Sequence, residues 1–492
     1  MKLKAWYDVV KPREDLREGK PLDASEFAVH LDKVRLGTAP DDYKIPQRFF
    51  DRTYLTGNLT GLAAEVVRRL SGLTTETSAV FNMTTQFGGG KTHALTLLYH
   101  LARNGSAANG FRGVGKVLER ASIGTVPDNC AIAVFVGTEF DSITGRGGDD
   151  GTPRRRTPWG ELAWQLGGAE SFAHVAQHDA DFVEPKGDVI EKMLPADRPC
   201  LILMDEVLNY ISTYREQGWH NKLYNFIQAL SETVRGRHNV VLVGSIPASE
   251  LAYTDKAHAD QQRLKNLLDR LGKAIIVSVE GETSEIIRRR LFEWDERAVT
   301  PDGRVILNKD AEDACRAYGD WIVENRQLLP SLINPDLARE QIRATYPFHP
   351  MVISVFERKW QTLPRFQQTR GVLRLLALWV STVYQEGYKG ALRDPLITLG
   401  TAPLDDATFR AAVFEQLGET KLEGAVTTDI AGRKDSHSVR LDAEAIDAIK
   451  KARLHRKAAT TIFFESNGGQ VGAETHEASV PEIRLAIGQP EA

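Results

Sequence analysis

The chain has 492 residues, of which 42% are hydrophobic and 26% are charged, and its formal net charge is -4. This composition predicts a globular protein of two to four domains and excludes a disordered chain. The slightly acidic net charge argues against a protein that coats nucleic acid through its overall charge. It does not exclude nucleic-acid contact through local basic patches. Cys130, Cys200 and Cys315 have neither zinc-site nor disulfide spacing. Without an apolar run of signal-peptide or membrane-span length, we expect a cytoplasmic protein with no membrane contact.

Residues 1–75 are expected to form an amino-terminal cap, with charged loops followed by a helical pattern over 59–70. From 76 to 280, apolar strands alternate with amphipathic helices. This alternation predicts an α/β fold with a mostly parallel sheet covered by helices on both faces. We therefore predict a three-layer core over 76–280.

A glycine-rich loop follows the first predicted strand, 79–83, and leads into a predicted helix over 94–101. The loop reads Gln86-Phe87-Gly88-Gly89-Gly90-Lys91-Thr92-His93. Consecutive glycines let backbone N–H groups surround a polyphosphate, the lysine can reach the outer phosphates, and the threonine hydroxyl can bind Mg²⁺. The sequence therefore predicts a nucleotide site, in the manner of a P-loop (Walker A motif). The alternative is a glycine-rich turn before an ordinary helix.

Two positions in this loop depart from the simplest interpretation. The strict pattern requires a glycine six residues before the lysine, and Thr85 stands there instead. His93 invites a catalytic role, but its place on the first turn of the predicted helix favours packing or hydrogen bonding.

A second motif, of Walker B type, ends the apolar run 200–204 with Asp205 and Glu206. Ligands bind at the carboxyl ends of strands in open α/β sheets. There Asp205 can hold the magnesium shell, while Glu206 can take a proton from a water aligned on the terminal phosphate. The alternative is a buried strand that ends in a solvated acidic turn.

A third apolar strand, 239–245, ends in Ser245. By analogy with additional-strand (ASCE) ATPases, this serine is the candidate sensor of the attacking water or terminal phosphate. It could equally begin the turn before Pro247.

The segment after the predicted strand 132–138 contains four arginines, at 146 and 154–156, among glycines and aspartates. Such a mobile basic loop could grip a nucleic-acid backbone. A charge run is more often only solvated, and that alternative stays open.

Beyond residue 281 the pattern becomes mainly helical, which predicts a helical lid over 281–400. From 401 to 492, short helices alternate with apolar runs at 460–464 and 483–487. These runs indicate a partial winged-helix-like region, truncated at the end of the chain.

The chain resembles large prokaryotic AAA+-type ATPases of an uncharacterised-domain family, which are encoded beside DNA methyltransferases and helicases in phage-defence loci. It is more distantly similar to the phage-exclusion (BREX) ATPases. The resemblance covers nearly the whole chain and depends on these runs: FFDRTYLT (49–56), QFGGGKTH (86–93), FVGTEF (135–140), WGELAWQLG (159–167), LMDEV (203–207), YPFHP (346–350) and TRGVLR (369–374). Family members are often about twice as long, so we expect a fragment or a short member without a carboxy-terminal effector region.

The resemblance implies a homo-oligomeric ring or arc in which a neighbour's arginine completes the site and a lid arginine acts as a second sensor. Arg370 is the lid candidate, with Arg374 behind it, and surface ion pairs are the alternative for both. Arg263 and Arg270, on the predicted helix 261–271, are the candidates for the neighbour's finger. The resemblance also implies adenine over guanine, and DNA, a DNA methyltransferase or a helicase as partners.

Together these features predict Mg²⁺-dependent ATP hydrolysis coupled to movement or assembly, in DNA modification or antiviral defence. A second hypothesis is a nucleotide-dependent switch or scaffold with little turnover. A P-loop kinase for a small molecule is a third, and the acid pair at Asp205 and Glu206 counts against it.

Overall fold

The computed structural model describes residues 3–20, 29–85, 90–247, 255–275, 283–300, 303–330, 333–360, 363, 368–390, 392–418, 420–467 and 477–490. The chain divides into two compact units. We call Ala28–Glu280, with Pro301–Gly303, the sheet unit, and the remaining chain, Met1–Phe27, Gly281–Thr300 and Arg304–Ala492, the helical unit. The two units divide near residue 280. The segment expected to form a cap, 1–75, instead contributes its first part to the helical unit and its second part to the sheet unit.

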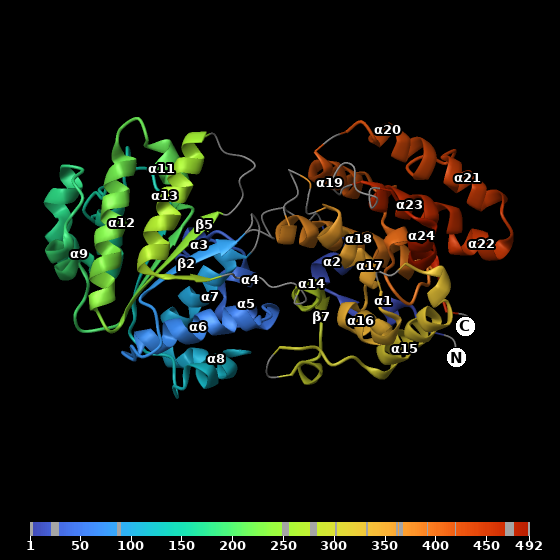
Figure 1. The fold of residues 1–492 in the computed structure, drawn as a ribbon, viewed down its shortest axis with the longest axis horizontal. Coiled ribbons are helices and arrows are strands. Elements are labelled where there is room, and N and C mark those ends of the chain that lie inside the picture. The colour runs from blue at the N-terminus through green and yellow to red at the C-terminus, as the bar shows by residue number, and fades with distance from the viewer. Residues whose placement is uncertain are drawn as a thin grey trace. The chain divides into compact units, whose positions relative to one another are not determined.

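The sheet unit contains a parallel five-stranded sheet in the order β3-β4-β5-β2-β6 (Figure 1). Its strands are β2 (Val80–Thr85), β3 (Ala131–Val136), β4 (Cys200–Asp205), β5 (Val240–Pro247) and β6 (Lys273–Ile275). This order inserts β5 between β2 and β4, so the strand before the glycine-rich loop and the strand with the two acids are not direct neighbours. The predicted α/β fold with a parallel sheet is confirmed.

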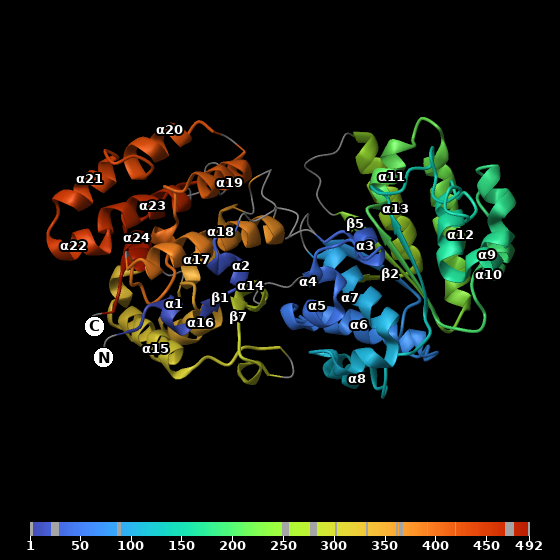
Figure 2. The same ribbon diagram turned by 180° about the vertical axis from the view of Figure 1, so that it is seen from behind.

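Helices cover both faces of this sheet (Figures 1 and 2). One face carries α3 (Leu31–Arg35), α4 (Asp41–Lys44), α5 (Pro46–Arg52), α6 (Gly57–Leu70), α7 (Lys91–Asn104) and α8 (Val114–Ala121). The other carries α9 (Pro158–Ala180), α10 (Gly187–Met193), α11 (Val207–Thr213), α12 (Trp219–Gly236) and α13 (Asp255–Leu271). Side chains alternate between the faces: in β4, Leu201 and Leu203 enter the first core and Ile202 the second.

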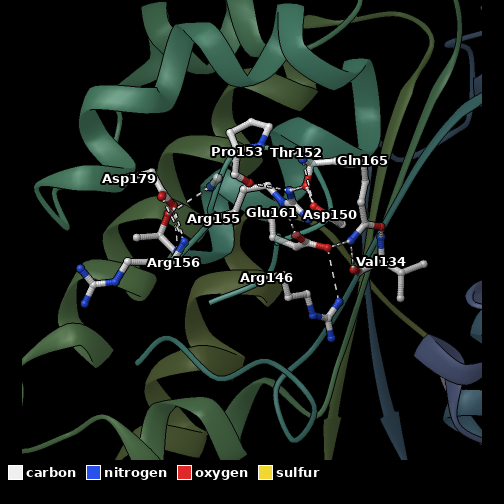
Figure 3. A network of polar contacts seen from close by, with 12 residues as sticks. Val134, Arg146, Asp150, Thr152, Pro153, Arg155, Arg156, Glu161, Gln165 and Asp179 are labelled. Carbon is white, nitrogen blue, oxygen red and sulfur yellow. Dashed lines mark hydrogen bonds and ion pairs between the residues drawn. The ribbon is translucent and has the colours of Figure 1, made fainter. Parts of the chain in front are cut away.

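The outer edge of β3 is covered by a side chain and not by another strand. The Gln165 side chain accepts a hydrogen bond from the Val134 N–H at 2.8 Å and donates one to the Val134 carbonyl at 2.9 Å (Figure 3). An exposed strand edge offers unpaired backbone groups to other chains. Gln165, on α9, therefore satisfies the edge groups of Val134 as a neighbouring strand would.

In the residues that the structure describes, the helical unit is built from helices and one short antiparallel pair of strands, β1 with β7. Its elements are α1 (Trp6–Val9), β1 (Lys11–Pro12), α2 (Glu14–Arg17), α14 (Thr283–Leu291), β7 (Phe292–Glu293), α15 (Lys309–Glu324), α16 (Ala338–Thr345), α17 (Pro350–Arg358), α18 (Gln368–Tyr388), α19 (Ala407–Leu417), α20 (Glu423–Ala425), α21 (His437–Glu444), α22 (Asp447–Ala452), α23 (Leu454–Ser466) and α24 (Val480–Ile487). No helix in the described part of the chain combines the length and apolarity needed to cross a bilayer.

The two apolar runs expected to form a wing are helical. They lie within α23 and α24, and the described residues from 401 onward contain no strand. A short apolar run has the same composition in a buried helix as in a strand, so tertiary packing decides. In α23, Phe464 stacks on Trp360 with ring centroids 5.2 Å apart. The start of α24 is fixed by a capping box between Ser479 and Glu482, a local sequence pattern that predicts a helix.

His349 is buried at the start of α17, with 1% of its surface exposed. Its Nδ1 accepts a hydrogen bond from the Met351 N–H at 3.3 Å, so the imidazole acts as the N-cap of the helix. Burial lowers the pKa of His349 to about 4, because the charged imidazolium would lose its hydration.

The depressed pKa of His349 makes stability depend on pH. Below pH ~6.5 the unfolded chain binds a proton that the folded chain refuses until about pH 4, so the free energy of unfolding falls across this window. His349→Asn keeps a capping oxygen and removes the titration. We expect the loss of stability between pH ~7 and ~5, measured by denaturant unfolding, to be smaller in this variant by about 2 kcal/mol. Exposed His437→Asn is the matched control, and equal losses in His349→Asn and wild type would contradict the assignment.

Candidate functional site

The carboxyl ends of β4 and β5 bring Asp205 and Ser245 together. Asp205 is 3% exposed and Ser245 is 2% exposed. The Ser245 hydroxyl donates a hydrogen bond to Oδ1 of Asp205, and the Thr92 hydroxyl, from the start of α7, donates one to Oδ2 at 2.7 Å. One buried carboxylate thus joins the ends of two adjacent strands to the first turn of a helix. Ser245 lies inside β5, which continues to Pro247, so it does not begin a turn.

The beginning of α7 supplies a cation to the same place. Gly90 precedes the helix with φ 81°, a left-handed conformation that favours glycine. Burial lowers the pKa of Lys91, while the nearby charges of Asp205 and Glu206 oppose that shift. The lysine therefore lies in the electrostatic field of both predicted acids. Gln86, Phe87, Gly88 and Gly89 lie outside the described residues, as do the side chains of Thr84 and Thr85.

Glu206 is the N-cap residue of α11 and has a backbone conformation that non-glycine residues seldom adopt, with φ 54°. The Asn209 side-chain amide donates a hydrogen bond to its Oε2. The residue as a whole is exposed, yet partial burial of the carboxyl group is the main cause of its raised pKa. The charge of Asp205 raises the pKa further, while Lys91 and the Asn209 hydrogen bond lower it.

Gly137, directly after β3, lets the chain approach Glu206 closely. Its N–H donates to the Asp205 carbonyl at 2.9 Å. A Cβ at this position would lie 2.2 Å from the Glu206 carbonyl oxygen. Glycine is thus required here for steric reasons, because any side chain would push β3 away from the turn that carries the two acids.

His93 has the packing role that its position favoured. Its Nε2 is 3.0 Å from the Thr53 hydroxyl, and its ring lies 4.6 Å from the Phe49 ring. Both partners belong to the run 49–56 that contributed to the family resemblance. The contacts join that run to the first turn of α7, next to Lys91 and Thr92.

The predicted arginines fall into different environments. Arg374 forms an ion pair with Glu415 at 2.7 Å, as the surface-pair alternative expected. The side chain of Arg370 lies outside the described residues. Arg263 donates to Asn221 at 2.8 Å and its guanidinium lies 4.3 Å from the centre of the Tyr224 ring. Arg270 lies in the last turn of α13, and both Arg263 and Arg270 are exposed.

The arginine-rich loop after β3 is held by internal contacts (Figure 3). Arg146 pairs with Asp32 at 2.6 Å and with Glu161 at 3.3 Å, and Arg155 pairs with Glu161 at 2.9 Å. The guanidinium of Arg156 points away from Glu161 and lies 4.5 Å from the centre of the Phe182 ring. These three arginines are therefore engaged in contacts within the protein, and Arg154 alone among the four is exposed.

Comparison with known protein families gives a match for the first part of the chain. Residues 1–283 match the family model described as the DUF499 N-terminal domain, which is more than half of the chain. The chain belongs to the DUF499 family. This agrees with the expected uncharacterised-domain family, and the match includes every element of the sheet described above. No curated protein matches the DUF499 chain.

Sequence reasoning missed Gly137 and Asn209 as parts of the candidate site. Gly137 stands at a strand end, where its pattern predicts only a turn. Asn209 lies three residues after Glu206, the spacing at which a side chain on the first helical turn reaches back to the N-cap residue. That spacing was available from the sequence, but the partner of Asn209 depends on the left-handed backbone at Glu206.

Proposed function

We propose that this protein binds ATP with Mg²⁺ and hydrolyses it, as a P-loop ATPase of AAA+ type. The observation that carries the proposal is the convergence on Asp205 of the Thr92 and Ser245 hydroxyls, beside Lys91 and Glu206. These five residues stand in three separate sequence motifs, and each motif was expected to contribute to one nucleotide site.

The strand order supports the same proposal. In additional-strand ATPases, an extra strand separates the phosphate-loop strand from the strand with the acids. Here β5 occupies that place, and its Ser245 contacts the first acid. A sheet in which β2 and β4 were direct neighbours would have favoured the small-molecule kinase alternative.

The residues present fit the expected ligands. Mg²⁺ prefers oxygen ligands, and the Thr92 hydroxyl meets the Asp205 carboxylate at 2.7 Å. A triphosphate suits the positive end of α7, where Lys91 adds a cation. Thr92 and Asp205 would hold the metal ion, and a bound Mg²⁺ would neutralise negative charge that develops on the phosphate oxygens.

The remaining roles follow from the chemistry of each side chain. Lys91 and the amides of the glycine-rich loop bind the phosphates. Glu206 accepts the proton of the attacking water, and its raised pKa brings its proton affinity nearer to that task. Ser245, within hydrogen-bond distance of Asp205, senses the occupant of the site.

The wider setting is proposed from the family resemblance. Hydrolysis would drive movement or assembly of a ring or arc, completed by Arg270 or Arg263 of a neighbour and by Arg370, in a DNA-modification or phage-defence system with DNA, a methyltransferase or a helicase as partner. The second candidate is a nucleotide switch with little turnover. It is favoured by Thr85, which replaces the glycine that opens the usual loop.

The test is ATP binding and phosphate release by the wild type and by Lys91→Ala, with and without duplex DNA. We expect Lys91→Ala to weaken ATP binding by about 100-fold or more, because a charge-assisted contact to the phosphates is lost. Exposed Lys192→Ala is the matched control and should behave as wild type. Tight ATP binding with negligible phosphate release would favour the switch, and equal ATP binding by Lys91→Ala and wild type would refute the proposed site.

A further inference from the structure

The hydrogen bond between Asn209 and Glu206 holds one oxygen of the predicted catalytic carboxylate. The Asn209 side-chain amide donates to Oε2, and the Asn209 backbone N–H donates to the Glu206 carbonyl at 3.0 Å. Within the described residues, the Glu206 carboxylate accepts a hydrogen bond at Oε2 and none at Oε1. The two oxygens therefore differ: one is fixed by the protein and the other is available to a water molecule.

The helix that bears Asn209 is itself fixed to the loop after β3. Ser142 is central to this contact: its Oγ lies 2.7 Å from the Tyr210 hydroxyl, and its N–H donates to the Tyr214 hydroxyl at 3.0 Å. Tyr214 in turn donates to Asp141 at 2.7 Å. Because Tyr210 within α11 and Tyr214 at its C-cap are both anchored in this way, Asn209 occupies a defined position relative to the sheet edge.

Glu206 needs such a constraint more than an ordinary first-turn residue does. Its side chain has several rotatable bonds and is exposed, so without a partner it would sample many rotamers. Its left-handed backbone aims it from a turn that Gly137 fixes from the other side. The backbone thus fixes where the Glu206 side chain starts, and the hydrogen bond from Asn209 fixes where its carboxylate lies.

We propose that Asn209 is a positioning residue, which holds the Glu206 carboxylate in the orientation that presents Oε1 to the attacking water. This inference rests on the proposed ATPase function and deepens it. Asn209 does not touch the nucleotide in this proposal, so it should affect the hydrolytic step and leave ATP affinity unchanged. A purely structural role at the start of α11 would instead alter folding, and with it binding and turnover together.

The experiment measures kcat, KM and ATP affinity for the full chain and four variants. Asn209→Ala removes the donor, and Asn209→Asp keeps the shape but places a second carboxylate against Glu206. Asn209→Gln retains an amide donor and tests for rescue. Ser212→Ala, at an exposed position of the same helix, is the matched control.

We expect kcat to fall about 10- to 100-fold in Asn209→Ala and further in Asn209→Asp, with ATP affinity within about twofold of wild type. Asn209→Gln should recover most of the lost activity, and Ser212→Ala should equal wild type. Wild-type kcat in Asn209→Ala, or a parallel loss of ATP affinity and thermal stability, would overturn the positioning role alone. A wild type that binds ATP without any turnover would overturn both this role and the proposed hydrolysis.

Discussion

Glu206→Gln is expected to lower ATP turnover by at least about 100-fold while ATP stays bound. Glutamine has almost the same shape as glutamate but cannot accept a proton from water. The substitution leaves the residues proposed to hold the phosphates and the metal ion, Lys91, Thr92 and Asp205, in place, so ATP affinity should persist. The measurement is phosphate release under saturating ATP, together with the amount of ATP retained after rapid desalting.

The same variant should accumulate in the ATP-bound assembly state, because that state can no longer decay by hydrolysis. Size measurement with ATP, with ADP and without nucleotide would reveal it. Glu216→Gln, at an exposed position beyond the end of α11, is the matched control for loss of a surface negative charge. Unchanged turnover in Glu206→Gln would assign the base to another residue, and loss of both binding and turnover would indicate a structural defect.

Glu161→Ala is expected to lower the free energy of unfolding by about 3–5 kcal/mol, which is the largest stability effect we expect in the sheet unit. Glu161 is 2% exposed and pairs with Arg155, which is 6% exposed, and with Arg146. Glu161 also accepts a hydrogen bond from Gln165 at 2.8 Å. Removing the Glu161 side chain would leave the buried Arg155 guanidinium without its carboxylate partner. It would also loosen Gln165, the side chain that covers the β3 edge.

Denaturant unfolding at constant pH is the appropriate measurement for Glu161→Ala. Glu161→Gln keeps the shape and the oxygen that Gln165 contacts, so its cost should be smaller, about 1–3 kcal/mol. Exposed Glu170→Ala on the same helix should remain within about 0.5 kcal/mol of wild type. If Glu161→Ala lowered the free energy of unfolding no more than Glu170→Ala does, the arginines would have found other partners without loss of stability.

Local pattern predicted the strands of the sheet well. The apolar runs expected at 79–83, 200–204 and 239–245 correspond to β2, β4 and β5, and each observed strand extends to the polar residues that were expected at its end. A strand buried on both faces must be apolar throughout, so its limits are visible in the sequence. The helices α6 and α7 were predicted for a similar local reason, since amphipathic periodicity does not depend on the rest of the chain.

One expectation failed, and the contacts of the arginine-rich loop were not foreseen, because both depend on interactions between distant residues. The runs taken for wing strands are α23 and α24, whose short apolar stretches are compatible with either state until Trp360 and its neighbours pack on them. The arginines of the loop after β3 appeared available for a phosphate backbone. Asp32 is distant from these arginines in the sequence, and Glu161 belongs to no local pattern that marks it as their partner. The ion pairs could therefore not be predicted from local sequence.

The sequence by itself determined which chemical groups the sheet edge would carry: a lysine and a threonine after the glycines, two acids after one strand and a serine at the end of another. These are local features, because each group directly follows or ends an element that its own neighbours specify. Only the tertiary structure decided that Thr92 and Ser245 meet on Asp205 and that Asn209 turns to Glu206. The order of the strands and the left-handed backbone at Glu206 depend on how the helices pack across the whole sheet. No single segment of the sequence specifies that packing.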